Sequence, residues 1–151
     1  MSALLAPTGW VHLDWVLLVV VAWLLIGAAG ALALRRLRLV ATLLFPLSAL
    51  CSLVLLLVAF DAASSVPEVA VLPIGLPQLP FHLRLDGLSA FFLLLIGGVS
   101  AGVSAFAAGY FRKGEGTPPG LICLEYHVFL ASIAMVVMAD DVCVFMVVWE
   151  T

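Results

Sequence analysis

Long runs of residues without a charged side chain constrain this chain more than any other feature. Three such runs cover residues 15–34, 39–60 and 88–111, and a fourth apolar run, residues 121–139, contains the single charged residue Glu125. About 20 apolar residues in a helix span a hydrocarbon core about 30 Å thick. Hydrophobic residues make up 66% of the chain and charged residues 10%, against about 45–50% and about 25% in soluble domains. The sequence therefore predicts a multi-pass membrane protein.

The predicted fold class is an all-α membrane protein with four transmembrane helices and the first half of a fifth. The expected helices cover residues 13–34, 39–60, 88–111 and 121–139, with a partial helix over residues 142–151. We expect residues 1–151 to form one membrane domain, the truncated N-terminal part of a larger subunit.

The connection between the second and third helices, residues 61–87, differs in composition from the rest. Four prolines exclude a regular helix there: Pro67, Pro73, Pro77 and Pro80. Leu79, Phe81, Leu83 and Leu85 alternate with Pro80, His82, Arg84 and Asp86, which is the period of a strand with one buried face. Residues 69–72 are the expected partner strand, with Gly75 in the turn. We predict a short extended hairpin on the membrane surface.

The basic residues predict the orientation of the chain. Five of the six lie in the first and third connections: Arg35, Arg36, Arg38, Arg112 and Lys113. Because cytoplasmic loops carry an excess of lysine and arginine, these connections are expected on the cytoplasmic side. The N-terminus, the hairpin and the Asp140–Asp141 turn then face outward.

Glu150 is the main candidate functional residue. It follows eight uncharged residues, and the ten residues 142–151 rise about 15 Å as a helix, which is half of a bilayer core. A carboxylate at that depth is costly and marks a functional hypothesis, here proton translocation. The alternative is that a shifted helix leaves Glu150 near an interface.

Two weaker candidates lie on the fourth helix. Glu125 and His127 are about 6–9 Å from its cytoplasmic start, where long side chains reach headgroup water. They are interpreted either as interfacial residues or as a proton entry point, since histidine titrates near neutral pH. On the third helix, Gly98 and Gly102 form a GxxxG pair, which favours close helix packing and, as an alternative, a hinge.

Enzymatic chemistry finds no support in the sequence. The cysteines Cys51, Cys123 and Cys143 have no metal-binding spacing and are interpreted as packing residues. There is no phosphate loop, nucleophile motif or zinc pattern. No catalytic residue, cofactor or metal ligand is therefore predicted, and the net charge of −3 does not indicate nucleic-acid binding.

Several stretches resemble a known superfamily. They are Leu85-Asp86-Gly87-Leu88-Ser89-Ala90-Phe91-Phe92, the segment 109–116, the segment 128–136, the segment 138–141 and Trp149-Glu150. Together they resemble the antiporter-like proton-pumping subunits of respiratory complex I, multisubunit cation/proton antiporters and membrane-bound [NiFe] hydrogenases. Residues 109–116 are most similar to the hydrogenase branch, the large membrane subunits of formate hydrogenlyase-type complexes. The resemblance covers residues 79–151; residues 1–78 match only in helix layout.

This resemblance implies an ion-translocating subunit of a redox-driven complex in the cell inner (plasma) membrane. Its implied partners are other membrane subunits, a peripheral redox arm and the lipid bilayer, with no nucleic acid and no cofactor of its own. Glu150 aligns with a family glutamate that pairs with a lysine two helices later. The alternatives are a complex I or cation/proton antiporter subunit and, from another class, a small structural or assembly protein with four helices.

Overall fold

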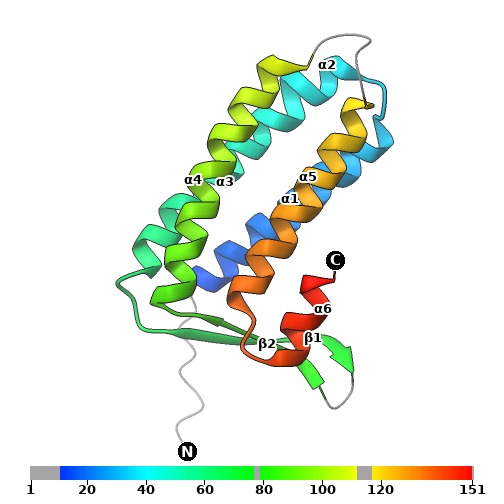
Figure 1. The fold of residues 1–151 in the computed structure, drawn as a ribbon. Helices are drawn as coiled ribbons and strands as arrows, with labels where there is room; N and C mark the ends of the chain where they lie inside the picture. The colour runs from blue at the N-terminus through cyan, green and yellow to red at the C-terminus, as the bar shows by residue number, and fades with distance from the viewer. Residues whose placement is uncertain (1–10, 77–78, 112–116, 151) are drawn as a thin grey trace, which may run out of the picture.

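The computed structural model describes residues 11–76, 79–111 and 117–150. Its elements in chain order are α1 (His12–Leu32), α2 (Leu37–Leu39), η1 (Val40–Leu44), α3 (Phe45–Ala62), β1 (Glu68–Leu76), β2 (Leu79–Leu85), α4 (Gly87–Tyr110), α5 (Pro119–Met138) and α6 (Val142–Trp149). Helix α3 packs along α4 and helix α1 packs along α5, each pair antiparallel (Figure 1). The long helices thus form two pairs side by side.

Four helices in the described residues are long and apolar enough to cross a membrane. They are His12–Leu32, Leu37–Ala62, Gly87–Tyr110 and Pro119–Met138. The shortest has 20 residues, which rise about 30 Å. The four predicted spans and the all-α membrane class are confirmed, with helix ends that differ by only a few residues from the prediction.

The second span remains one helix although it contains a proline. Pro46 has no N–H to donate to the carbonyl one turn earlier. The π-helical turn η1 lies directly before it, and the amide of Phe45 donates to the oxygen of Val40, five residues back. This wider turn accommodates the proline, so the helix continues from Leu37 to Ala62.

The predicted extended hairpin is present. Strands β1 and β2 pair antiparallel, and Glu68 lies opposite Leu85 at the open end. The alternation along β2 has the expected consequence, because Leu83 and Leu85 are 0% and 3% exposed while Arg84 between them is exposed. Strand β2 therefore turns one face toward the helices.

The predicted position of the hairpin turn was wrong. Gly75 lies within β1, opposite Pro80, and β1 continues to Leu76, opposite Leu79. The register shifts between Leu72 and Gly75. This irregularity leaves Pro73, which has no N–H to donate, outside the regular ladder, so the strand can continue beyond it.

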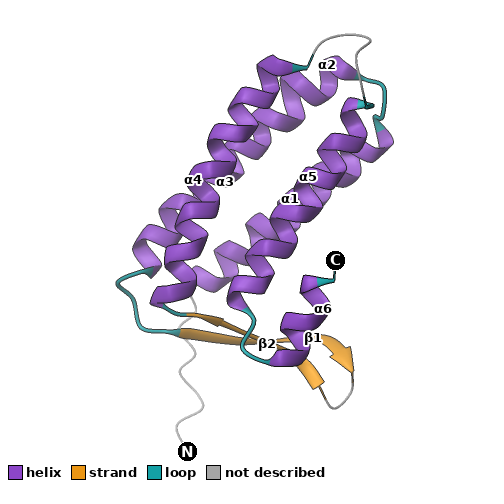
Figure 2. Cartoon of the chain, in the orientation of Figure 1, coloured by secondary structure: helices purple, strands orange, loops and turns teal. Residues whose placement is uncertain are grey.

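The hairpin closes one end of the helix bundle. It runs across the end where α1 and α4 begin and α5 ends, with α6 rising from the same side (Figure 2). The amide of Asp140 donates to the oxygen of His82 at 3.1 Å, and Leu83 forms an isolated bridge with Ala139. This is the end of the bundle that the charge distribution predicts to face outward.

Aspartates cap two of the helices at this end. One carboxylate oxygen of Asp86 accepts the amides of Leu88 at 3.0 Å and Ser89 at 2.9 Å, at the start of α4. Asp141 accepts the amide of Val144 at 2.8 Å, at the start of α6. Because these bonds favour the ionised carboxylate, the amide of Ser89 lowers the pKa of Asp86, and the amide of Val144 lowers the pKa of Asp141.

Candidate functional site

His127 is fully buried in the bundle, with 0% of its surface exposed. Its ring centroid lies 6.0 Å from that of Phe45 and 5.2 Å from that of Tyr126. On the other side, α1 approaches so closely that a Cβ on Gly27 would lie 3.2 Å from the Cβ of His127. The residue expected near headgroup water is thus enclosed by α1, α3 and its own helix.

The hydrogen bonds of His127 define its tautomer. Its Nδ1 lies 2.6 Å from the carbonyl oxygen of Cys123. Because a carbonyl oxygen only accepts, Nδ1 carries the proton. The second nitrogen, Nε2, is buried and has no hydrogen-bond partner in the described part of the chain. In the neutral ring this leaves an unpartnered basic nitrogen inside the core, which costs stability.

Glu125 does not share this environment. It lies on α5 two residues before His127, and its side chain is exposed rather than buried. Successive helix residues differ by about 100° in direction, so two residues apart is close to the opposite face. The structure does not bring Glu125 and His127 together, and their role as a proton entry point stays a prediction.

A chain of hydroxyl groups connects three helices next to His127. The Oγ atoms of Ser48 on α3 and Ser104 on α4 are 3.1 Å apart, and Ser104 Oγ lies 3.2 Å from the hydroxyl of Tyr126 on α5. The Tyr126 hydroxyl donates to the oxygen of Ser100 at 3.1 Å. Since that oxygen only accepts, Ser104 donates to Tyr126 and Ser48 donates to Ser104. The donor and the acceptor of each of these three hydrogen bonds are thus assigned.

The sequence interpretation missed these residues. A signal was present, because Ser48 and Ser52 on one apolar helix, and Ser100 and Ser104 on another, are each four residues apart. That spacing places two hydroxyls on the same helix face, and serines facing each other across membrane helices form hydrogen bonds.

Glu150 directly follows α6 and is exposed. Its amide donates to the oxygen of Met146 at 3.2 Å, and its carboxylate forms no ion pair or hydrogen bond in the part of the chain that the structure describes. Nothing in the described residues brings it into contact with His127. Its role in translocation stays a prediction.

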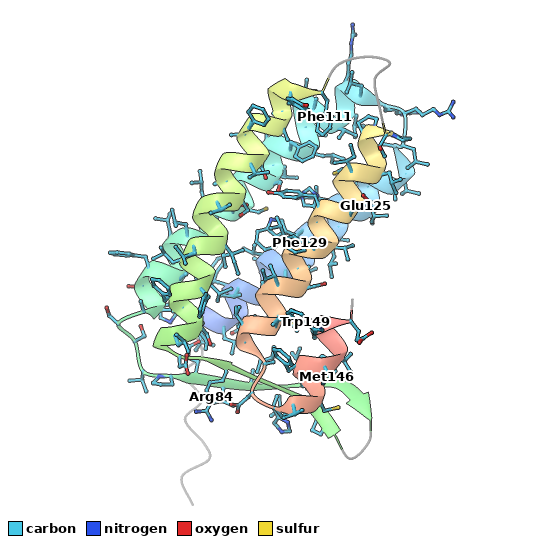
Figure 3. All side chains as sticks on the ribbon, viewed as in Figure 1. Arg84, Phe111, Glu125, Phe129, Met146 and Trp149 are labelled. Atoms are coloured by element: carbon cyan, nitrogen blue, oxygen red, sulfur yellow. The ribbon has the colours of Figure 1, made fainter. Side chains whose placement is uncertain are left out.

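An apolar groove of about 560 Å³ lies between α5 and α6. Glu125, Phe129 and Trp149 follow one another along it (Figure 3). Its other lining residues are Leu124, Val128, Ser132, Ile133, Val136 and Val148. Glu125 and the end of α6, next to Glu150, therefore border the same groove, away from His127.

The closest approach of α4 to α3 lies at Gly97, next to the predicted pair Gly98 and Gly102. A Cβ on Gly97 would lie 2.8 Å from the backbone nitrogen of Leu56 on α3, whereas a Cβ on Gly102 would meet nothing within 4 Å. Both Gly98 and Gly102 are exposed. Gly97 therefore carries the close backbone contact with α3, while a Cβ on Gly98 would lie 3.6 Å from Leu56 Cδ1. Close packing of another helix on the Gly98–Gly102 face stays a prediction.

The fold defines a class: a multi-pass helical membrane protein with a two-stranded hairpin closing one end of the bundle. Residues 72–118 match the family model described as NADH-Ubiquinone oxidoreductase (complex I), chain 5 N-terminus. The matched segment contains the end of β1, all of β2 and all of α4. The match supports a relationship with the antiporter-like subunit superfamily. No curated protein matches the chain.

Proposed function

We propose that this chain forms the N-terminal part of an antiporter-like, proton-translocating membrane subunit of a redox-driven complex. The observation that carries the proposal is the match of residues 72–118 to the N-terminal family model of complex I chain 5. The four candidate spans are in keeping with such a subunit. Its partners would be other membrane subunits and a peripheral redox arm, in the cell inner membrane with the hairpin outward.

In this proposal Glu150 is the carboxylate that binds and releases the translocated proton. A nearby cation favours the ionised form of a carboxylate, so movement of a cation toward or away from Glu150 would change its proton occupancy. The resemblance implies a lysine in that role. Because Glu150 has no ionic partner among the described residues, the cation would come from another part of the assembly.

His127 is proposed as a second proton-binding group. Its Nδ1–H already donates to the Cys123 oxygen, so a proton arriving at Nε2 would produce the imidazolium without breaking that bond. The burial of Nε2 without a partner supports this role. Glu125, exposed nearer the cytoplasmic end of α5, would deliver protons from that side through an intermediate, since the two side chains are not in contact.

The test is proton translocation by the complete complex in sealed vesicles. We expect Glu150→Gln to reduce redox-driven proton uptake at least about tenfold, because an amide cannot carry the proton, and Glu150→Asp to retain part of it. Assembly is checked by the amount of each subunit that purifies with the complex. Unchanged proton uptake in an assembled Glu150→Gln complex would refute the role of Glu150.

The finer proposal is the hydrogenase branch, with hydrogenase-4 component B of formate hydrogenlyase-type complexes as the specific relative. It rests on the resemblance of residues 109–116. The alternatives are a subunit of an NADH:quinone oxidoreductase or of a multisubunit cation/proton antiporter. Purification of the native complex decides: hydrogen-dependent electron transfer supports the hydrogenase branch, and NADH oxidation or cation exchange without electron transfer supports one of the others.

A structural or assembly role is the candidate from another class. In that case the chain would purify with assembly intermediates of the complex and would be absent from the purified active complex. Co-purification of the chain with electron-transferring subunits in constant proportion would refute it.

A further inference from the structure

His12, the first residue of α1, lies between two carboxylates from different elements. Its Nδ1 is 2.7 Å from an oxygen of Glu68 at the start of β1, and its Nε2 is 2.8 Å from an oxygen of Asp61 near the end of α3. Asp61 and Glu68 border the connection between α3 and β1. One imidazole ring therefore joins the start of α1 to both ends of that connection.

This arrangement requires a charged ring. A carboxylate only accepts hydrogen bonds, so each His12 nitrogen must carry a proton to bond to it. A neutral imidazole has one N–H, and only the imidazolium has two. In the described residues the ion-pair partners of His12 are these two carboxylates. On its own helix, Asp14 accepts the amide of Val11 and adds a further negative charge.

The Glu68 carboxylate also caps α1. It accepts the amides of His12 at 3.2 Å and Leu13 at 2.8 Å. Burial by itself raises the pKa of Glu68, but the Leu13 amide and the His12 side chain and amide outweigh it, so the pKa is lowered. Glu68 is therefore ionised near neutral pH and holds the start of α1 through two amides as well as through the ring, whereas the 80% exposed Asp61 side chain is joined to α1 through His12.

We propose that the α3–β1 connection is fastened to the start of α1 by a proton-dependent clasp, in which protonated His12 bridges Asp61 and Glu68. When His12 loses a proton, only one ring nitrogen can donate. The exposed Asp61 is then released to water, and Glu68 loses its counter-charge, which weakens its hold on the start of α1. The clasp is closed at low pH and opens as the pH rises.

The other anchor of the hairpin lacks this dependence. His82 Nδ1 lies 3.1 Å from Asp141, a single bond that a neutral ring can donate. Next to it, Arg84 pairs with Asp140 at 2.7 Å, and the arginine remains charged at all relevant pH values. A rise in pH should therefore loosen the His12 end of the hairpin and leave the His82 end in place.

The first test uses the chain in lipid nanodiscs and two NMR readings over the range of about pH 5.5 to 9. The ¹⁵N shifts of the His12 ring report its protonation. Hydrogen exchange of the Leu13 amide, corrected for the intrinsic exchange rate, reports how firmly that amide is bonded to the Glu68 carboxylate. We expect the protection of Leu13 to fall roughly three- to tenfold as the ring loses its second proton, with the same midpoint. Constant protection while the ring titrates would overturn the proposal.

The second test is Asp61→Asn. A neutral His12 can donate from Nδ1 to Glu68 and accept at Nε2 from the side-chain amide that this substitution introduces, so both arms persist without the second proton. We expect the alkaline loss of Leu13 protection to disappear in Asp61→Asn and to remain in the matched variant Asp140→Asn at the other anchor. Unchanged pH dependence in Asp61→Asn, or its loss in Asp140→Asn, would contradict the clasp.

Discussion

Replacement of Gly97 by alanine tests whether α3 and α4 pack on the Gly97 face. The added Cβ would lie 2.8 Å from the nitrogen and 3.1 Å from the Cα of Leu56, and 3.0 Å from the oxygen of Ser52. These are backbone atoms, so no side-chain rotation relieves the contact. Ordinary contact begins at 3.4 Å, so the helices must separate locally by about 0.6 Å, a gap that forfeits a quarter or more of the dispersion energy of each contact across it.

The expected cost follows from two opposing contributions. Overpacking of this kind costs about 1–3 kcal/mol, and alanine recovers about 0.8–1 kcal/mol of helix propensity relative to glycine. We expect Gly97→Ala to destabilise the chain by up to about 2 kcal/mol relative to the wild type, and by about 1–3 kcal/mol relative to an alanine substitution that meets no neighbour. Gly102→Ala is the matched control, because it is the same change on the same helix and its Cβ meets nothing within 4 Å.

The assay is reversible unfolding in mixed micelles of mild detergent and SDS, followed by circular dichroism and tryptophan fluorescence. Gly97→Ala should unfold at a lower SDS fraction than the wild type, and Gly102→Ala at the same or a higher fraction. If Gly97→Ala were as stable as Gly102→Ala, the assignment of the α3–α4 contact to the Gly97 face would be refuted.

Two further predictions follow from hydrogen bonds. Tyr126→Phe removes the hydroxyl that links α4 to α5 and should cost about 1–2 kcal/mol in the same unfolding assay. Tyr110→Phe, at a 64% exposed tyrosine, is the control and should leave stability unchanged. Equal effects of the two substitutions would refute a stabilising role of the interhelical hydroxyl bonds. In the folded protein the pKa of Asp86 is lower than its ordinary value of 3.8. The ionised carboxylate therefore stabilises the fold at any pH above 3.8. This stabilisation is lost as the pH falls through the lowered pKa. Asp86→Asn should therefore show a smaller loss of stability on acidification than the wild type, and an unchanged acid transition would contradict the capping role.

The local patterns that predicted the fold correctly depend on few tertiary contacts. Uncharged runs such as residues 88–111 determine where a membrane helix forms, because backbone amides in lipid must bond within their own helix. The alternation along residues 79–86 determines which face of β2 is buried, since side chains on a strand alternate regardless of the partner. The turn at Gly75 was mispredicted, because the register depends on how β1 passes Pro73.

The candidate site could be predicted only in part. The sequence identified Glu125, His127 and Glu150 as the ionisable residues in or beside apolar runs. It could not show that His127 is buried, with Nε2 unpartnered among the described residues, while Glu125 two residues away is exposed. The position along a helix is a property of the sequence, but the direction of each side chain relative to the neighbours is a property of the packed bundle.

The sequence by itself determined the number of spans, the hairpin and the candidate ionisable residues, because these follow from hydrophobicity and side-chain period along the chain. Only the tertiary structure decided that Gly97 meets the backbone of α3, and that His12 joins Asp61 and Glu68, which lie 49 and 56 residues from it in the sequence. Adjacent helix residues point about 100° apart, so the rotation of each helix against its neighbours selects the contacting face. That rotation results from all the packed side chains together, and no local pattern encodes it.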